Sequence, residues 1–173
     1  MIFTFEERLS DSPFVERIWR AQSERTGDFL SVAASQWEMV VSRYKGETTV
    51  TVRGPETKVT PMHVNLVGGE WFGIIFRYGA FMPHCPVGDL VDGDLDLPEA
   101  SSKSFWLNGS AWQFPNYENA DTFVDRLTRE GLLVHDPIIG SVLRGEPQEL
   151  SPRLRTASFC ASHRVDAGIH PAN

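Results

Sequence analysis

Short stretches of alternating hydrophobic and polar residues fill most of the first hundred positions. The strongest apolar run is Phe72 to Phe76 (FGIIF), which is long enough for a buried strand and too short for a typical helix. Two further runs, at 37–44 (WEMVVSRY) and 48–53 (TTVTVR), are rich in β-branched residues, and Lys45-Gly46-Glu47 between them predicts a hairpin turn. Several short strands at such close spacing predict a β-sandwich or a β-barrel.

Weaker strand patterns surround these runs. Residues 29–32 predict one more strand, and residues 58–64 predict a strand or a sheet edge in which Pro61 limits pairing. Ser12-Pro13 favours the start of a helix, although the alternation from Val15 to Trp19 fits a strand equally well.

The pattern weakens in the acidic, turn-rich residues 88–98. Residues 99–104 then predict a polar linker. Residues 108–116 mix aromatic side chains with glycine and proline, and they predict irregular structure.

The hydrophobic period changes to that of a helix after Asn119. Asn119 suits the N-cap position, and Gly131 stands where such a helix would end. A second short helix follows, with Asp136 as its cap and Pro137 at its first position. The apolar sides of the two helices are formed by Ala120, Phe123, Val124 and Leu127, and by Ile138, Ile139, Val142 and Leu143.

Size and charge narrow the class of protein. A chain of 173 residues with 41% hydrophobic content fits one domain with an ordinary core. The formal charge of −7 argues against binding of nucleic acid by this chain alone, because phosphate contacts need a basic face. Two distant cysteines, an acidic N-terminal segment and the lack of a long apolar run predict a cytoplasmic protein with no membrane partner.

Motifs for catalysis are missing from the sequence. The five histidines (His63, His84, His135, His163 and His170) show no metal-binding spacing, and the chain contains neither a nucleophile elbow nor a glycine-rich phosphate loop. We therefore predict no catalytic residue, no metal site and no cofactor, and we expect that the protein is not an enzyme.

A pocket for a small molecule would combine aromatic walls with a few polar groups that fix orientation. Rings could come from Trp19, Trp37, Trp71, Phe76 and Trp112, and polar contacts from Glu38, Arg43, Arg77 and His84. Packing in the core is the competing interpretation for each ring, and a structural ion pair explains Arg77 equally well.

Three segments together carry a resemblance to a known family. They are 37–41 (WEMVV), 50–57 (VTVRGPET) and 73–81 (GIIFRYGAF), the last followed by 89–92 (DLVD) and 95–97 (LDL). In this arrangement the chain resembles the N-terminal sensing domains of AraC/XylS-type transcription regulators over residues 10–150.

The resemblance implies an α+β fold, with a cupin-like β-barrel or sandwich followed by a C-terminal pair of antiparallel helices. It also implies a small-molecule effector in the β domain and a homodimer formed through the helices. The implied dimerisation residues are Ala120, Phe123, Val124, Leu127, Ile138, Ile139 and Val142. The expected domains are 1–116 for sensing and 117–146 for the helical linker and dimerisation region.

The resemblance breaks down in the last segment, 147–173. Leu150-Ser151-Pro152-Arg153 is similar to the opening of the family's first recognition-domain helix, and Phe159 stands at the expected offset. Arg155 and Ala157 do not fit the pattern, and no periodic helix follows Cys160. We therefore expect a truncated or frameshifted tail without a complete helix-turn-helix domain.

The leading hypothesis is thus an effector-binding and dimerisation domain of an AraC-type regulator that lacks its own complete DNA-binding domain. One alternative is a cupin-like enzyme, which would need a histidine and carboxylate metal set. Another is a dimerisation module without a ligand, in which side chains would fill the interior of the β domain.

Overall fold

The computed structural model describes residues 2–146, which divide into two compact units at Asp136/Pro137. The first unit holds all the strands and one α-helix, and the second begins with a short helix. The helix after Asn119 packs into the β domain. The predicted division into a sensing domain at 1–116 and a helical region at 117–146 stays a prediction. Residues 147–173, including the predicted truncated tail, lie outside the described part of the chain.

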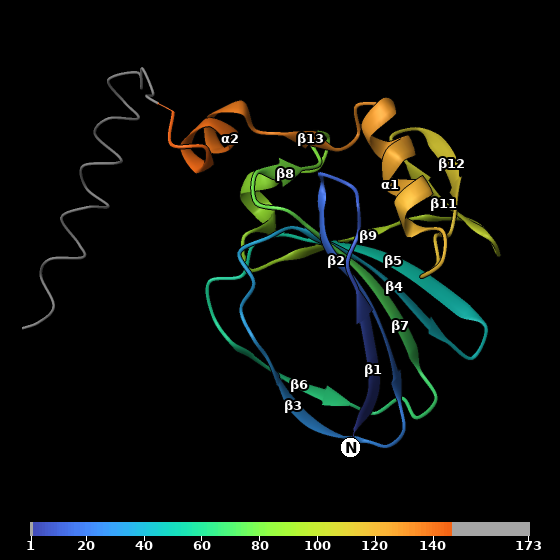
Figure 1. Ribbon diagram of the computed structural model, residues 1–173. Helices are drawn as coiled ribbons and strands as arrows, with labels where there is room; N and C mark the ends of the chain where they lie inside the picture. Colours follow the sequence, from blue (N-terminus) through green and yellow to red (C-terminus); the bar gives the residue numbers. More distant parts are fainter. Residues whose placement is uncertain (1, 147–173) are drawn as a thin grey trace, which may run out of the picture. The chain divides into compact units, whose positions relative to one another are not determined.

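A six-stranded antiparallel sheet is the centre of the first unit (Figure 1). Its order is β1-β2-β7-β4-β5-β9. The strands are β1 (Phe3–Arg8), β2 (Val15–Ser23), β7 (Glu70–Phe76), β4 (Glu38–Tyr44), β5 (Glu47–Arg53) and β9 (Asp94–Leu97). The apolar run at 72–76 therefore forms a central strand, as predicted.

One face of this sheet carries the main hydrophobic core. Along β7, Phe72, Ile74 and Phe76 point to this face because alternate residues of a strand share a side. The face is covered by β11 (Ser104–Leu107), β12 (Ser110–Gln113) and helix α1 (Ala120–Arg129), and β10 (Glu99–Ser101) pairs with β11. Phe105 and Trp112 are fully buried there.

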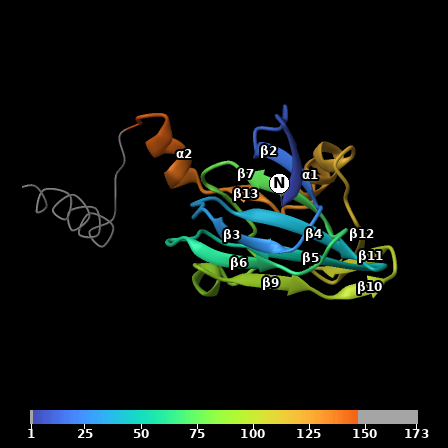
Figure 2. The ribbon, with the colours of Figure 1, turned by 90° about the horizontal axis from the view of Figure 1, so that it is seen from below.

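The opposite face of the sheet is covered differently. Strands β3 (Gly27–Ser31) and β6 (Thr60–Val64) pair with each other across it and form a separate two-stranded ribbon (Figures 1 and 2). Val40 and Val64 are buried on this side, yet neither belongs to the main core cluster. The fold thus has two distinct interior spaces.

Three small elements complete the first unit. Strand β8 (Ala80–Phe81) pairs with β13 (Val134–His135), and the 3-10 helix η1 (Val87–Leu90) precedes β9. Leu90 is buried, and Leu95 packs against the core, so the acidic segment at 88–98 is anchored by its leucines. The mostly antiparallel β architecture with two α-helices confirms the α+β class in its general form.

The hairpin predicted around Gly46 is confirmed. Strands β4 and β5 pair from Tyr44↔Glu47 outward, which leaves Lys45 and Gly46 as a two-residue loop. Both have positive φ, 49° and 87°, as a type I′ turn requires.

Two predictions of irregular structure were wrong. Residues 99–104 contain β10 and the first residue of β11, and residues 108–116 contain β12. Leu107 pairs with Ser110 around an Asn108-Gly109 loop in which both residues have positive φ. Asn-Gly between strands is one of the strongest short hairpin patterns. The prediction of irregular structure gave more weight to the mixture of aromatic residues, glycine and proline around it.

The segment before Trp19 was expected to be a short helical turn that runs into the first strand, and it is a turn at Pro13 and Phe14 followed by a strand from Val15. Ser12 forms a turn instead of a helix cap, since its carbonyl accepts a bond from the Val15 N–H and its hydroxyl accepts one from the Phe14 N–H. Strand β2 starts immediately after that turn. Strand β1 pairs along β2, although residues 3–8 gave no strand prediction.

The helix predicted after Asn119 is confirmed as α1, and Gly131 follows its end with φ 71°. Asn119 is at the N-cap position, but its side chain accepts a bond from the Asn116 N–H rather than from the helix. The apolar side of α1 is buried in the core of the first unit through Ala120, Phe123, Val124 and Leu127. The β domain already covers these four residues within one chain, and their predicted role in a dimer contact stays a prediction.

Helix α2 (Pro137–Leu143) opens the second unit and confirms the second predicted helix. Ile138, Ile139 and Val142 are between 42% and 58% exposed, and their predicted role in dimerisation stays a prediction. Strand β13 separates the two helices along the chain. Among residues 2–146, no helix has the length and apolar character needed to cross a membrane.

Candidate functional site

A cavity of about 480 Å³ lies between the six-stranded sheet and the β3–β6 ribbon. Its lining comes from strands β1, β2, β4, β5 and β7 on one side and from β3 and β6 on the other. The lining includes the aromatic and charged side chains of Phe3, Phe5, Trp19, Phe29, Glu38, Arg53, Glu56 and Trp71. We call this space the ribbon cavity.

Aromatic rings form much of the wall of the ribbon cavity. Phe3 makes edge-to-face contacts with Phe29 and Trp71, with ring centroids 5.2 Å and 5.8 Å apart. Phe5 stacks on Trp19 at 5.9 Å. Rings in these arrangements hold one another in place, and they offer flat apolar surfaces to a ligand.

Glu38 is the polar centre of the cavity. It is the first residue of β4, and its side chain is only 18% exposed. The Trp19 indole N–H donates a hydrogen bond of 2.6 Å to Oε1 of Glu38. Burial raises the pKa of Glu38 above its ordinary value of 4.5, and the Trp19 hydrogen bond and the Arg53 charge oppose that rise only in part.

Arg53 lies opposite Glu38 across the β4–β5 ladder. Its Nη2 donates to Glu56 Oε1 at 3.1 Å, whereas its Nη1 lies 3.8 Å from Glu38 Oε2. Glu56 is the principal partner of Arg53, and Glu38 receives only a longer-range attraction. The polar end of the cavity thus holds two carboxylates and one closely engaged guanidinium.

The segment that carries Glu56 is fixed by contacts with the loop before β9. A Cβ added to Gly54 would lie 2.0 Å from the Leu90 carbonyl oxygen, so only glycine fits at this crossing. Asp92 accepts bonds from the Thr57 N–H at 2.7 Å and from the Thr57 hydroxyl at 2.6 Å. These bonds lower the pKa of the Asp92 carboxyl.

Gly73 positions Trp19 over the sheet. The two residues are cross-strand partners in the β2–β7 ladder, and a Cβ on Gly73 would lie 2.3 Å from the indole nitrogen. Without a side chain on β7, the indole reaches across that strand from β2 to Glu38 on β4. Three adjacent strands therefore combine to place one hydrogen bond inside the cavity.

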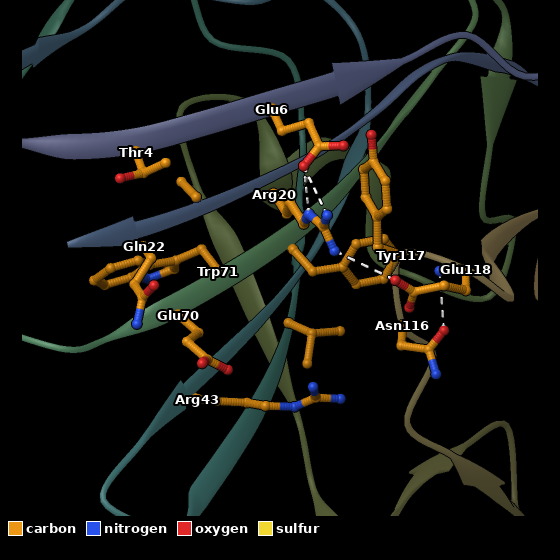
Figure 3. A pocket seen from close by; sticks show the side chains of 13 residues that line it. Thr4, Glu6, Arg20, Gln22, Arg43, Glu70, Trp71, Asn116, Tyr117 and Glu118 are labelled. Atoms are coloured by element: carbon orange, nitrogen blue, oxygen red, sulfur yellow. Dashed lines mark hydrogen bonds and ion pairs between the residues drawn. The ribbon is translucent and has the colours of Figure 1, made fainter.

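A second, polar pocket of about 400 Å³ lies on the core face of the sheet, where its lining includes Val41, Phe72 and the segment before α1 (Figure 3). Arg20 binds Glu6 through two nitrogens at 2.9 Å and 2.7 Å, and it contacts Glu118 at 3.3 Å. Its guanidinium also lies 4.4 Å from the centre of the Tyr117 ring. These groups satisfy one another and tie β1 and β2 to the segment before α1, which is a structural role.

The structure divides the predicted ligand residues among four places. It brings Trp19, Glu38 and Trp71 together at the ribbon cavity. Arg43 belongs instead to the polar pocket. Trp37, Phe76 and Trp112 are buried in the main core, which confirms the competing interpretation for those rings.

Arg77 and His84 lie away from the ribbon cavity on the exposed part of the surface. The Arg77 Nε–H donates to the Val15 carbonyl at 3.0 Å, so this side chain has a structural contact. Partial burial lowers the pKa of His84. Neither residue contributes to the cavity wall.

Several lining residues were missed by the sequence analysis, namely Phe3, Phe5, Phe29, Arg53 and Glu56. The alternation of buried and exposed residues along a strand could have identified Arg53. Arg53 is two residues beyond Thr51 on β5 and opposite in phase to the buried Val52, so its side chain points to the cavity face. Phe3 and Phe5 could not be placed without recognising β1.

Within the described range of the chain, no group of three or more histidine, cysteine, aspartate or glutamate side chains could hold a metal ion. Comparison with protein-family models, curated proteins and solved structures gave no match.

Proposed function

We propose that residues 2–136 form the effector-binding domain of a transcription regulator of the AraC/XylS type, with a cupin-like β fold. The observation that supports this most strongly is the ribbon cavity, which combines aromatic walls with one buried carboxylate. Its volume of about 480 Å³ is within the usual range for small-molecule sites.

The position of the cavity favours ligand binding over a purely structural role. The main core is on the other face of the sheet and already contains the largest fully buried side chains. The space under the ribbon is therefore separate from the main core. A buried carboxylate in that space costs folding free energy, and such groups are often kept for binding.

A cupin-like enzyme is the alternative that uses the same space. It would need a set of metal ligands or a paired acid and base. Glu38 and Glu56 are the carboxylates of the cavity, and Glu56 is engaged by Arg53. Binding is the function that this arrangement supports better, because the other acid or base groups of the lining, Glu56 and His63, are engaged by Arg53 and Asp28.

In the proposed mechanism, a bound effector changes the relative populations of two arrangements of the protein and so biases a dimer. Helix α2 supplies apolar residues for that homodimer. The chain itself, with its charge of −7, is not proposed to bind nucleic acid without a further domain. The cytoplasm is the compartment that this role requires.

The test is native mass spectrometry of the full chain purified directly from cells. We expect a retained small molecule on the wild-type protein and its loss from Trp19→Ala, which opens the cavity wall. Arg43→Gln alters the polar pocket on the other face and should retain the molecule. Retention of the small molecule by both variants would contradict the ribbon cavity as the binding site. Tight binding of DNA by this chain alone would contradict the proposal that a further domain is needed for DNA binding.

A further inference from the structure

The chemical class of the ligand can be inferred from the unequal engagement of the charged groups in the ribbon cavity. Glu38 Oε1 accepts the Trp19 N–H at 2.6 Å. Glu38 Oε2 lies 3.8 Å from Arg53 Nη1, beyond hydrogen-bond distance, and accepts no hydrogen bond from any residue between 2 and 146. One carboxylate oxygen is therefore available inside a largely apolar space.

The positive groups of the cavity are less available than this carboxylate. Arg53 donates to Glu56 at 3.1 Å, and that pair is mostly sheltered, with 30% and 17% of the side chains exposed. Arg17 lies 3.6 Å from Glu7 and is about half exposed to solvent. An anionic ligand at Arg53 would have to displace Glu56, and at Arg17 it would meet a half-exposed group beside Glu7. A cationic ligand would meet Glu38 Oε2, which accepts no hydrogen bond from residues 2–146 and lies in the sheltered part of the cavity.

The remaining titratable groups around the cavity do not alter this balance. His63 is on β6, and its Nδ1 lies 2.6 Å from Asp28 Oδ1 on β3, so these two side chains engage each other on the ribbon. The aromatic walls also favour a cation, because the faces of indole and phenyl rings attract positive charge. A flat apolar group fits between the same rings through stacking or edge contacts.

We propose that the ribbon cavity binds a small molecule with a flat, apolar body and a protonated amine, which donates to Glu38 Oε2. This inference rests on the proposed function, since it specifies the ligand class for the same cavity. Trp19 has a double role in it, as a wall for the apolar body and as the donor that orients the Glu38 carboxylate.

The experiment compares three probes that share one body and differ in the head group: 2-naphthylmethylamine, 2-naphthalenemethanol and 2-naphthoic acid. Binding to the full chain is measured by isothermal titration calorimetry at neutral pH and physiological salt. We expect the amine to bind at least about 10-fold tighter than the alcohol or the acid, a factor that corresponds to about 1.4 kcal/mol.

Two variants assign that preference to a residue. Glu38→Gln should weaken the amine about 10-fold and leave the affinity for the alcohol within about 2-fold, which shows that the cavity has kept its shape. Glu70→Gln is the matched control, because Glu70 is a carboxylate of the polar pocket on the other face. It should leave all three affinities unchanged.

The outcomes separate the ligand class from the function itself. Equal binding of all three probes, or a preference for the acid, would overturn the amine inference while retaining a small-molecule cavity. A loss of the amine preference in Glu70→Gln instead of Glu38→Gln would move the site to the polar pocket and overturn it as well. Failure of all three probes to bind at millimolar concentration would contradict both the inference and the proposed function.

Discussion

Gly73 and Trp19 face each other across the β2–β7 ladder, and the indole occupies the space that a side chain at position 73 would fill. This relationship determines the geometry of the ribbon cavity, because it lets Trp19 on β2 reach across β7 to Glu38 on β4. A glycine in a central strand weakens the sheet through its backbone entropy. Here that cost is offset by the placement of an aromatic wall and a hydrogen bond.

Gly73→Ala should therefore displace the indole and disrupt the cavity. The added methyl group would lie 2.3 Å from the Trp19 nitrogen, so either the ring or the strand must shift. We expect a loss of about 1–3 kcal/mol in the free energy of unfolding, as is typical for overpacking. Urea denaturation followed by tryptophan fluorescence measures it.

Gly88→Ala is the matched control for that substitution. A Cβ at Gly88 would meet no heavy atom within 4 Å, and its φ is not in the left-handed region. Its free energy of unfolding should stay within about 0.5 kcal/mol of the wild type. If Gly73→Ala were equally mild, the close packing of Trp19 on the sheet would not be the constraint that we describe.

The hydrogen bond between Trp19 and Glu38 gives a second prediction. Trp19→Phe retains a ring on the sheet but removes the donor, which leaves Glu38 buried with no close hydrogen bond. We expect a destabilisation of about 2 kcal/mol, the usual cost of an unsatisfied buried acceptor. A double-mutant cycle with Glu38→Ala, which removes the acceptor, measures the coupling, which should be at least about 0.5 kcal/mol. Additive effects would show that the two side chains act independently.

The burial of α1 gives a third prediction. Leu127 is fully buried in the core of the first unit, whereas Val142 on α2 is 58% exposed. Leu127→Ala should reduce the free energy of unfolding by about 2–5 kcal/mol, as cavity-forming substitutions do, and Val142→Ala should change it by less than about 0.5 kcal/mol. Chemical denaturation at several protein concentrations provides the measurement.

The same pair of variants distinguishes folding from association. If α1 is part of the core, Leu127→Ala should lower stability without a selective loss of dimer at concentrations where the protein remains folded. Val142→Ala tests the proposed dimer contact of α2, and analytical ultracentrifugation reports its effect. Selective dissociation of a stable Leu127→Ala protein would support α1 as a dimerisation helix.

Much of the fold could be predicted because local patterns and tertiary packing agree. The run at 72–76, the Lys45-Gly46 turn and the helical period after Asn119 each specify one local structure, and all three are present. Strand β1 is different, since four of its six residues are exposed and its pattern carries little apolar signal. It is a strand because it pairs with β2, and a single local segment cannot reveal that pairing.

Only part of the site could be predicted, because residues that are adjacent in a strand lie on opposite faces of the sheet. Trp37 and Glu38 are neighbours, yet Trp37 is in the main core and Glu38 is in the ribbon cavity. Likewise, Phe76 points to the core and Ile75 lines the cavity. Successive residues of a strand face opposite sides, so the phase of each strand separates these pairs. The partner of Trp19 could not be predicted without the strand order.

The buried state of Glu38 gives the last prediction, which concerns pH. Because burial raises the pKa of Glu38 in the folded protein, the unfolded chain ionises first as the pH rises from about 4.5. Ionisation of this residue therefore favours unfolding, and its contribution to stability is greatest below pH 4.5 and declines as the pH rises through the folded pKa. Glu38→Gln keeps an oxygen for the Trp19 N–H and removes that penalty. The Tm difference between Glu38→Gln and the wild type should then shift in favour of the variant between pH 4 and pH 7, in calorimetric scans at constant ionic strength. If the Tm difference shifted in favour of the wild type instead, the attraction of Arg53 would outweigh the burial of the Glu38 carboxylate. The folded protein would then already neutralise the negative charge that we propose is paired with the ligand amine.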